Sequence, residues 1–303
     1  MHQEINPKVK TPQLNEWQRR NPAPSRVSGT GARVTVLMAT WNRAHIISKA
    51  IESVRAQTFQ DWELIIVDDG STDDTQKIVA EWQKKEPRIV AFRNNPNKGI
   101  SISYNVGLRA ARGKYVAMID DDDPWIPKDK LEKQVEFLDT HPDYVGCGAG
   151  VVVVNPEGKE LYRYLKPETD AAIRKYMLFS NPMANSTTLF RLSAAKKVGL
   201  YDESSRYSGD RDFWLKMGLV GRLCNAPEYF SYYTMSNVNT SVARIRPHLK
   251  ASLNFMKRYK GKYPSYYMAL LLNEAQYLYS FLPVAVRAKL HTLLARLKRH
   301  AVG

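Results

Sequence analysis

Short apolar runs alternate with amphipathic stretches along the chain from residue 34 onward. The runs VTVLMA (34–39) and WELIIVDDG (62–70) are rich in β-branched residues, which predicts two strands. Between them, five apolar residues recur at helical spacing: Ile46, Ile47, Ala50, Ile51 and Val54. The alternation repeats, with predicted helices over 73–85 and 100–111 and predicted strands over 88–92 and 114–119. Buried strands that alternate with helices of about a dozen residues are typical of a mainly parallel sheet covered by helices on both faces.

The pattern is less regular after the fourth predicted strand. A helix is predicted over 128–140 and a long strand over 144–154, followed by a turn at 155–158. Further helices are predicted over 170–179, 193–198 and 210–219, with short strands between them. From about residue 244 the pattern is helical and basic throughout. We therefore expect three parts: a flexible basic leader over 1–33, an α/β body over 34–243 and a basic helical extension over 244–303.

The net charge divides the chain at the same places. Its 303 residues include 45 Lys and Arg against 30 Asp and Glu, a formal charge of +15. The body over 34–243 holds 27 of each sign, so the surplus lies in residues 1–33, with +4, and in residues 244–303, with +11. A nucleic-acid-binding domain is expected to carry its basic surplus on the folded body, so we expect no nucleic-acid partner.

Composition excludes other classes of protein. An apolar fraction of 44% is enough for a sizeable core, which excludes disorder over the whole chain. The longest nearly uncharged apolar run, residues 145–154, is about half of the roughly 18 residues that a membrane-spanning helix needs. Cys147 and Cys224 are the only cysteines, which argues against a disulfide scaffold. We expect a cytoplasmic protein without a transmembrane span or a cleaved signal.

Acidic residues collect where two predicted strands end. Asp68 and Asp69 end the second strand, and four consecutive aspartates, residues 120–123, follow the fourth. Ligands of open α/β sheets bind at the carboxyl ends of the strands. Adjacent carboxylates repel by about 1 kcal/mol per close pair even in water, and oxygen ligands without His or Cys select Mg²⁺ or Mn²⁺. The alternative is that these aspartates only cap the next helix.

The segments that carry these residues resemble a known family. VTVLMATWNRAHIISKAIESVRAQTFQDWELIIVDDGSTDDT and NPNKGISISYNVGLRAARGKYVAMIDDDDPW resemble the inverting glycosyltransferases of family 2, whose donor half reads approximately P-T-Y-N-R, V-D-D-G-S-x-D, N-x-G and L-D-x-D-D. The resemblance covers roughly residues 34–240. It implies a GT-A fold, which is Rossmann-like, with a nucleotide-sugar-binding half over 34–125 and an acceptor half over 126–243.

The resemblance also implies roles for single residues. The donor-binding positions are Ala39, Thr40, Asn42, Arg43, Asp68, Asp69, Lys98, Gly99, Asp120 and Asp121. Asp122 matches the direct metal ligand, with Asp120 as a second one, so the implied cofactor is Mg²⁺ or Mn²⁺. Ala39 stands where the family has Pro, and Trp41, in place of Tyr, would either stack on the nucleotide or pack. Lys98 could equally be a solvated charge.

The acceptor half carries a phrase that resembles the family's base motif, VGLYDESSRYSGDRDFWLKMG. Asp210 falls on the general base, and Arg211 and Trp214 follow it on the acceptor side. Two positions depart from the family: Gly209 replaces the usual Glu, and Thr234 stands where Arg is common. Asp212 is the fallback base, and its alternative role is a salt bridge to Arg211 or Arg222.

These roles describe an inverting hexosyl transfer. A sugar would move from a nucleotide donor, expected to be a UDP-sugar, to a hydroxyl of a saccharide or lipid-linked acceptor in cell-surface polysaccharide or glycolipid assembly. Asp210 would take the proton of that hydroxyl while the cation neutralises the leaving diphosphate. The alternative is a non-catalytic sugar-nucleotide-binding or scaffolding subunit of a glycan-assembly complex.

The basic extension suggests where such an enzyme sits. Residues 283–300 place five apolar residues on one helical face: Val286, Leu290, Leu293, Leu294 and Leu297. A basic amphipathic helix is typical of a segment that binds an anionic membrane surface, which would make the protein peripheral on the cytoplasmic face through residues 244–303. The alternative is a helix packed on the body with a solvated charged face.

Overall fold

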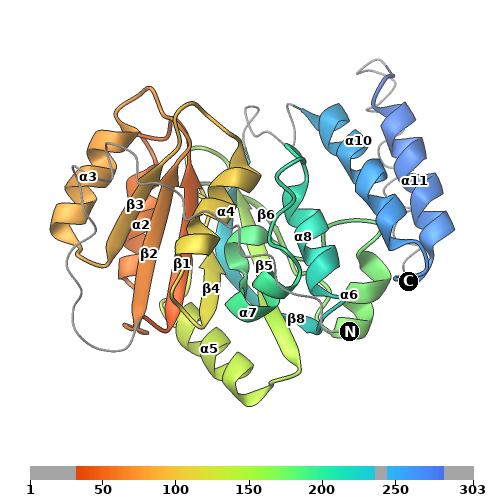
Figure 1. The fold of residues 1–303 in the computed structure, drawn as a ribbon, viewed down its shortest axis with the longest axis horizontal. Coiled ribbons are helices and arrows are strands. Elements are labelled where there is room, and N and C mark those ends of the chain that lie inside the picture. The colour runs from red at the N-terminus through yellow and green to blue at the C-terminus, as the bar shows by residue number, and fades with distance from the viewer. Residues whose placement is uncertain (1–31, 236–243, 283–303) are drawn as a thin grey trace, which may run out of the picture.

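One sheet of eight strands runs through the part of the chain that the computed structural model describes, residues 32–235 and 244–282 (Figure 1). Its strands are β1 (Val34–Thr40), β2 (Trp62–Asp68), β3 (Ile89–Arg93), β4 (Tyr115–Met118), β5 (Tyr144–Val154), β6 (Glu160–Tyr164), β7 (Leu189–Arg191) and β8 (Arg222–Thr234). They lie in the order β3-β2-β1-β4-β7-β5-β6, and β8 pairs with β5.

Parallel pairing predominates in this sheet. β1 pairs parallel with β2 and β4, β2 with β3, and β5 with β8. β7 runs antiparallel between β4 and β5, and β6 is antiparallel to β5. β2 and β4 are buried at every position, as expected for parallel strands that are covered on both faces. The predicted α/β fold with a mainly parallel sheet is therefore confirmed.

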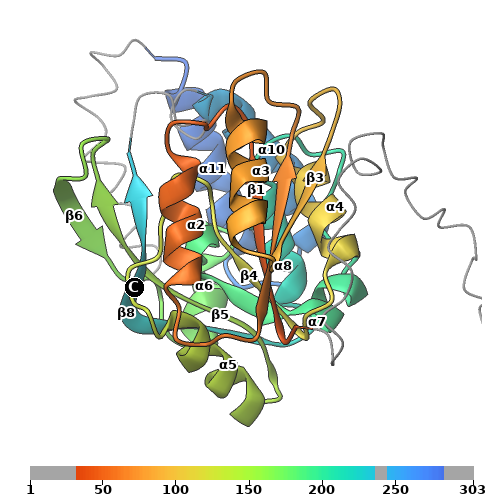
Figure 2. The same cartoon turned by 90° about the vertical axis from the view of Figure 1, so that its left-hand side faces the viewer.

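Helices cover both faces. They are α2 (Ile47–Arg55), α3 (Thr75–Lys85), α4 (Ile100–Ala110), α5 (Lys130–Thr140), α6 (Asp170–Tyr176), α7 (Leu192–Lys197), α8 (Gly209–Met217), α10 (Ile245–Met256) and α11 (Tyr266–Tyr279), with short 3₁₀ turns η1 (Asn185–Thr187) and η2 (Lys257–Tyr259). Successive strand residues point to opposite faces. Val36 and Met38 pack with α2, α3 and α5, whereas Leu37 and Val67 pack with α4 and α8. Figure 2 shows α2 and α3 in front of the strands and α8 behind them.

The C-terminal helices share a core with the α/β body. Phe255 and Met256 of α10 belong to the same buried cluster as Trp214 of α8. Tyr263, between η2 and α11, donates its hydroxyl hydrogen bond to the Leu215 carbonyl at 2.7 Å. Residues 244–282 are thus packed against α8. The amphipathic segment over 283–300 and nearly all of the predicted leader lie outside the described residues, within which no helix has the length and apolar character to cross a membrane.

Candidate active site

The loop after β1 is tied to the loop after β2. The Asn42 N–H donates to Ser71 Oγ at 2.9 Å, and Asn42 Oδ1 accepts from the Thr72 N–H at 2.8 Å. Asn42 has a φ of 55°, in the left-handed region that Asn tolerates better than most residues. This turn leaves Trp41 53% exposed, so its ring is outside the core and open to a ligand.

The two aspartates at the end of β2 have different surroundings. Both are buried. Asp68 Oδ1 accepts from the Ser71 N–H at 2.9 Å, and Asp68 Oδ2 lies 3.5 Å from Arg93 Nε. Asp68 Oδ2 accepts no hydrogen bond from the residues that the structure describes.

Asp69 instead organises the loop that leads into α4. Its Oδ1 accepts from Asn94 Nδ2 at 2.8 Å and from the Lys98 N–H at 3.0 Å, and its Oδ2 accepts from the Gly99 N–H at 2.8 Å. The main-chain N–H groups of Lys98 and Gly99, two positions expected to bind the donor, are therefore bonded to Asp69. Gly99 has a φ of 94°, which favours glycine at the start of this helix.

Asp120 lies in a network of polar side chains at the end of β4. Its Oδ1 accepts from the Tyr104 hydroxyl at 2.7 Å and from Asn185 Nδ2 at 2.9 Å, and its Oδ2 accepts from Ser186 Oγ at 3.0 Å. Sequence reasoning did not identify Tyr104, Asn185 or Ser186. Tyr104 could have been suspected from the sequence, because it lies in the first turns of the helix that follows Gly99, a position expected to bind the donor.

Of the following three aspartates, two lie beside the Arg43 guanidinium group. Arg43 Nε donates to Asp121 Oδ1 at 3.3 Å, and Arg43 Nη2 lies 3.8 Å from Asp122 Oδ2. Burial, followed by the charge of Asp122, raises the pKa of Asp121 to about 7. Asp123 is buried and accepts from the Thr234 N–H at 3.1 Å. The Thr234 hydroxyl also donates to the Asp122 carbonyl at 2.8 Å, so this side chain joins the end of β8 to the aspartate turn.

The carboxylates suit a divalent cation that is shared with a substrate. Burial raises the pKa of both Asp120 and Asp122, and Asp122 further raises that of Asp120, so a positive charge here would be stabilised. Within residues 32–235 and 244–282, no three His, Cys, Asp or Glu side chains form a complete metal cage. Mg²⁺ usually needs only one or two carboxylates because substrate phosphates and waters complete its shell.

The proposed base lies at the start of α8. Asp210 Oδ2 accepts from Asn181 Nδ2 at 2.8 Å, in the loop after α6. The preceding Gly209 has no room for a side chain, because a Cβ there would lie 2.6 Å from Ser101 Oγ of α4. A larger side chain at position 209 would therefore require Ser101 of α4 to move.

Two tyrosines link the acidic clusters. The rings of Tyr104 and Tyr201 lie 5.0 Å apart. Burial is the largest cause that raises the pKa of each, and the charges of both Asp120 and Asp210 raise it further. Asp120, at the end of β4, is thus bonded to one of two adjacent tyrosine rings.

Asp212, the fallback base, lies in the protein interior. The Asp212 side chain is fully buried, and its Oδ1 accepts from Arg258 Nη2 at 3.1 Å and from the Tyr259 hydroxyl at 2.7 Å. This corrects the expectation of a base, because no acceptor hydroxyl can reach a carboxylate with no exposed surface. The expected salt bridge is real, but its partner is Arg258 instead of Arg211 or Arg222.

Arg211 and Trp214 also face away from an acceptor. Arg211 is 8% exposed and donates to the Leu178 carbonyl at 2.6 Å, and burial lowers its pKa to about 10. Trp214 is fully buried against Phe190 and Phe213. Both side chains pack α8 into the core, and neither is exposed beside Asp210.

Comparison with known proteins agrees with this geometry. The family model described as glycosyl transferase family 2 matches residues 35–199, more than half of the chain. The chain is 34% identical over 190 residues to EpsE of Bacillus subtilis, which covers 62% of this chain and 67% of that protein. It is 33% identical over 187 residues to an uncharacterized glycosyltransferase of Methanocaldococcus jannaschii, which covers 60% and 63%. The matches span about two thirds of each relative.

Solved structures share the fold. The mannosyltransferase PcManGT from Pyrobaculum calidifontis, in complex with GDP-Man and Mn²⁺, superposes with a TM-score of 0.62 at 20% identity over 86% of this chain and 75% of that one. Residues 1–349 of S. aureus TarS, in complex with UDP-GlcNAc, give 0.60 at 20% identity over 82% and 73%. The fold is thus the GT-A fold that the sequence predicted.

Proposed function

The chain belongs to glycosyl transferase family 2, and from this premise we propose that it transfers a hexose, with inversion, from a nucleotide sugar to a hydroxyl of a saccharide or lipid-linked acceptor. The observation that carries the proposal is a pair of carboxylates held in place by hydrogen bonds, Asp120 by Tyr104 and Asp210 by Asn181. Inverting transfer needs a leaving-group site and a proton acceptor that flank the anomeric carbon.

The donor would bind along the loops after β1, β2 and β4. Trp41 is exposed there, and Asp68 Oδ2 is a buried acceptor that a nucleobase N–H could satisfy. Asp69 already accepts three hydrogen bonds from the protein, so we assign the base contact to Asp68. We propose a UDP-sugar donor, and the fold neighbour TarS in complex with UDP-GlcNAc supports that choice.

Asp122, with Asp120, would hold Mg²⁺ or Mn²⁺ beside the diphosphate. When bound, such an ion neutralises charge on the departing nucleoside diphosphate. Arg43 lies close enough to Asp121 and Asp122 to offset part of their mutual repulsion before the donor arrives. The Mn²⁺ complex of PcManGT supports a divalent ion in this fold.

Asp210 would take the proton from the acceptor hydroxyl as that hydroxyl attacks the anomeric carbon. Asn181 donates to one carboxylate oxygen at 2.8 Å, which fixes the group and leaves the other oxygen to the hydroxyl. Asn181 is thus a positioning residue for the base.

Turnover of UDP-sugars tests this function. We expect release of UDP from at least one sugar nucleotide with Mn²⁺ or Mg²⁺, and an Asp122→Asn variant should lower the rate at least about 100-fold. Asp129→Asn, at an exposed aspartate, is the matched control. Thermal stabilisation by a UDP-sugar without any release of UDP would instead support a sugar-nucleotide-binding or scaffolding subunit.

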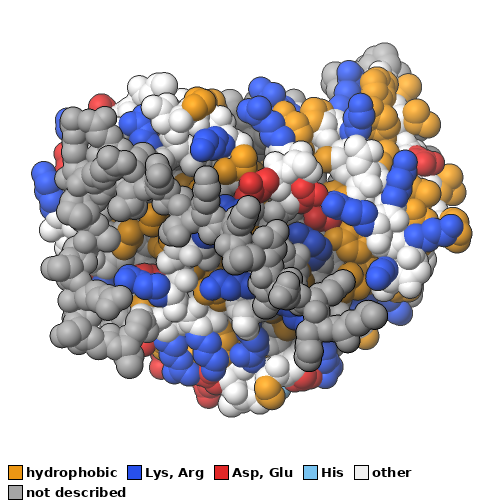
Figure 3. Space-filling model, in the orientation of Figure 1, with side chains coloured by type: hydrophobic (Ala, Val, Ile, Leu, Met, Phe, Trp, Pro, Cys, Tyr) orange, Lys and Arg blue, Asp and Glu red, His pale blue; other side chains and the backbone are white. Residues whose placement is uncertain are grey.

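We also propose that the C-terminal helices place the enzyme on an anionic membrane surface on the cytoplasmic face. Large apolar side chains are exposed along one side of α11 and just beyond it: Tyr267, Met268, Leu271, Leu278, Phe281 and Leu282. Residues 244–282 also hold seven Lys and Arg against the single Glu274. Figure 3 shows apolar and basic side chains side by side over α10 and α11. Such a surface suits a lipid-linked acceptor.

A further inference from the structure

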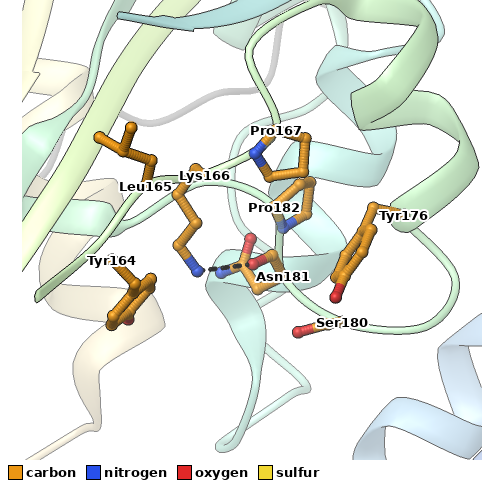
Figure 4. Close-up of a pocket in the computed structure, with 8 residues that line it drawn as sticks. All are labelled: Tyr164, Leu165, Lys166, Pro167, Tyr176, Ser180, Asn181 and Pro182. Carbon is orange, nitrogen blue, oxygen red and sulfur yellow. Dashed lines mark hydrogen bonds between the residues drawn. The ribbon is translucent and has the colours of Figure 1, made fainter. Parts of the chain in front are cut away.

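A pocket of about 560 Å³ opens beside the proposed base. Its walls come from the end of β6, the end of α6 and the loops that follow them (Figure 4). The lining residues are Tyr164, Leu165, Lys166, Pro167, Tyr176, Ser180, Asn181 and Pro182. The volume falls within the range of small-ligand sites.

One residue joins this pocket to the catalytic carboxylate. Asn181 accepts from Lys166 Nζ through its main-chain carbonyl at 3.1 Å, and it donates through Nδ2 to Asp210 Oδ2 at 2.8 Å. A molecule in the pocket is therefore separated from the proposed base by one side chain. Asp120, by contrast, is not among the lining residues and is bonded to the Tyr104 hydroxyl at the end of β4.

The pocket carries a cation without a counterion. Lys166 Nζ bonds to the Asn181 carbonyl and lies 5.2 Å from the centre of the Tyr164 ring. None of the lining residues is acidic, and Asp210, the carboxylate whose charge acts on Lys166, is already bonded to Asn181. Burial lowers the pKa of Lys166 to about 8, against the opposing charge of Asp210, so it stays mostly protonated at neutral pH.

The other walls suit a sugar ring. Tyr164 and Tyr176 lie on opposite sides of the Lys166 ammonium group in Figure 4. Aromatic faces pack against the C–H faces of sugars, while a partly desolvated ammonium group gains most from an anion. A neutral saccharide would fill the pocket and leave the ammonium charge uncompensated, at a cost in free energy.

We infer that this pocket is the acceptor subsite and that it takes a saccharide with an anionic substituent, a carboxylate or a phosphate, paired with Lys166. The inference rests on the proposed function because Asp210 must be the base for the pocket to receive the acceptor. To the proposed function the inference adds a negative charge on the acceptor and the residue that recognises this charge, Lys166.

Binding of matched sugars to the full chain tests the inference. The probes are the methyl glycosides of glucose, galactose and mannose, their uronic acid counterparts, and the corresponding 6-phosphates, measured by calorimetry or saturation-transfer NMR. We expect at least one anionic probe to bind about tenfold more tightly than its neutral partner. Preference for uronides or for 6-phosphates identifies the anionic group.

Two lysine variants separate the subsite from general charge attraction. Lys166→Met should abolish the preference for the anionic probe, and Lys260→Met should keep it. Lys260 is the matched control because its Nζ also lies over a tyrosine, 5.5 Å from the centre of the Tyr267 ring, on the exposed surface. A preference that survives in Lys166→Met overturns the inference, as does equal binding of all probes or binding of none.

Release of UDP from sugar nucleotides by the unaltered chain is measured in parallel. If the anionic probes bind as expected and no donor turns over, the proposed function fails and the anion-binding pocket stands. If the donor turns over and the probes show no preference, the transferase stands and the assignment of this pocket fails.

Discussion

At the scale of single residues, Asp210 and Asp212 show how position on one helix decides the role of a carboxylate. Residues two positions apart on a helix point in widely different directions. Asp210 meets Asn181 beside a pocket, and Asp212 meets Arg258 and Tyr259 in the interior. The sequence predicted the different directions. It could not predict the partners, because Arg258 is 46 residues away and is brought near only by the packing of α10 on α8.

The two aspartates should therefore respond differently to the same substitution. Asp210→Asn should lower the rate of transfer about 10³-fold with little change in stability, because the proton acceptor is removed from a partly exposed site. Asp212→Asn should retain transfer but lower the free energy of unfolding by about 2 kcal/mol, because a buried hydrogen-bonded ion pair is lost. Steady-state kinetics and urea unfolding measure the two effects. Near-normal transfer by a folded Asp210→Asn variant would refute the assignment of the base.

A second residue-scale prediction concerns a buried lysine on the other face of the sheet. Lys130 of α5 is fully buried, donates to Gln134 Oε1 at 2.8 Å and lies 4.0 Å from the centre of the Trp125 ring. Burial lowers its pKa from 10.5 to about 7. Between these values the unfolded chain binds the proton and the folded chain does not, so the contribution of Lys130 to stability rises with pH.

Substitution of Lys130 by Met should expose this dependence. The stability of the unaltered chain relative to Lys130→Met should rise by about 3 kcal/mol between pH 7 and pH 10, as measured by urea unfolding at each pH. Lys133→Met is the control, since Lys133 is an exposed lysine on the same helix that pairs with Glu228. A difference between the unaltered chain and Lys130→Met that is constant with pH would show that Lys130 keeps its ordinary pKa when folded.

At the scale of elements, the donor half was the more predictable part. The predicted strand over 34–39 is β1, Val34–Thr40, and the predicted helix over 100–111 is α4, Ile100–Ala110. β1 is a nearly continuous buried run and α4 buries several of its residues, so their apolar residues indicated both elements in the sequence. β6 was not predicted because all five of its residues are exposed on a sheet edge, which leaves no alternation to read. β7 has three residues and lies between the helices predicted over 170–179 and 193–198, where a short strand was expected without bounds.

The C-terminal helices were predicted as helices, but their packing was not. Their basic charge suggested an extension separate from the body, and it obscured the apolar residues that face α8. Phe255, Met256 and Tyr259 are buried, whereas the basic residues Lys257 and Lys260 beside them are exposed. A short segment can thus contribute apolar side chains to the core and basic side chains to the surface.

We expect this packing to contribute to the stability of the whole described fold. Phe255→Ala should lower the free energy of unfolding by about 3 kcal/mol, because it leaves a cavity between α10 and α8. Leu271→Ala, on the exposed side of α11, should change it by less than about 0.5 kcal/mol. Thermal or urea unfolding of both variants checks the difference. Equal stability of the two would mean that α10 is not part of the cooperative core.

At the scale of the whole molecule, the site forms only when distant segments come together. Asp120 follows β4, Asp210 begins α8, and Asn181 lies in the loop after α6. The two carboxylates could be predicted because they match a family motif. Asn181 and Lys166 belong to no motif and could not be predicted, since their role depends on how β6 and α6 are placed beside α8.

The charge of the whole chain leads to the last prediction, association with an anionic membrane. The full chain should sediment with vesicles of phosphatidylglycerol and phosphatidylcholine at low salt, and added salt should weaken this binding because screening reduces the attraction of basic residues. Leu271→Ser with Leu278→Ser should reduce binding several-fold, since both side chains are exposed on α11. Leu161→Ser with Tyr162→Ser, an equally exposed apolar pair on β6, should not. Equal binding by the two double variants would contradict a membrane contact through α11.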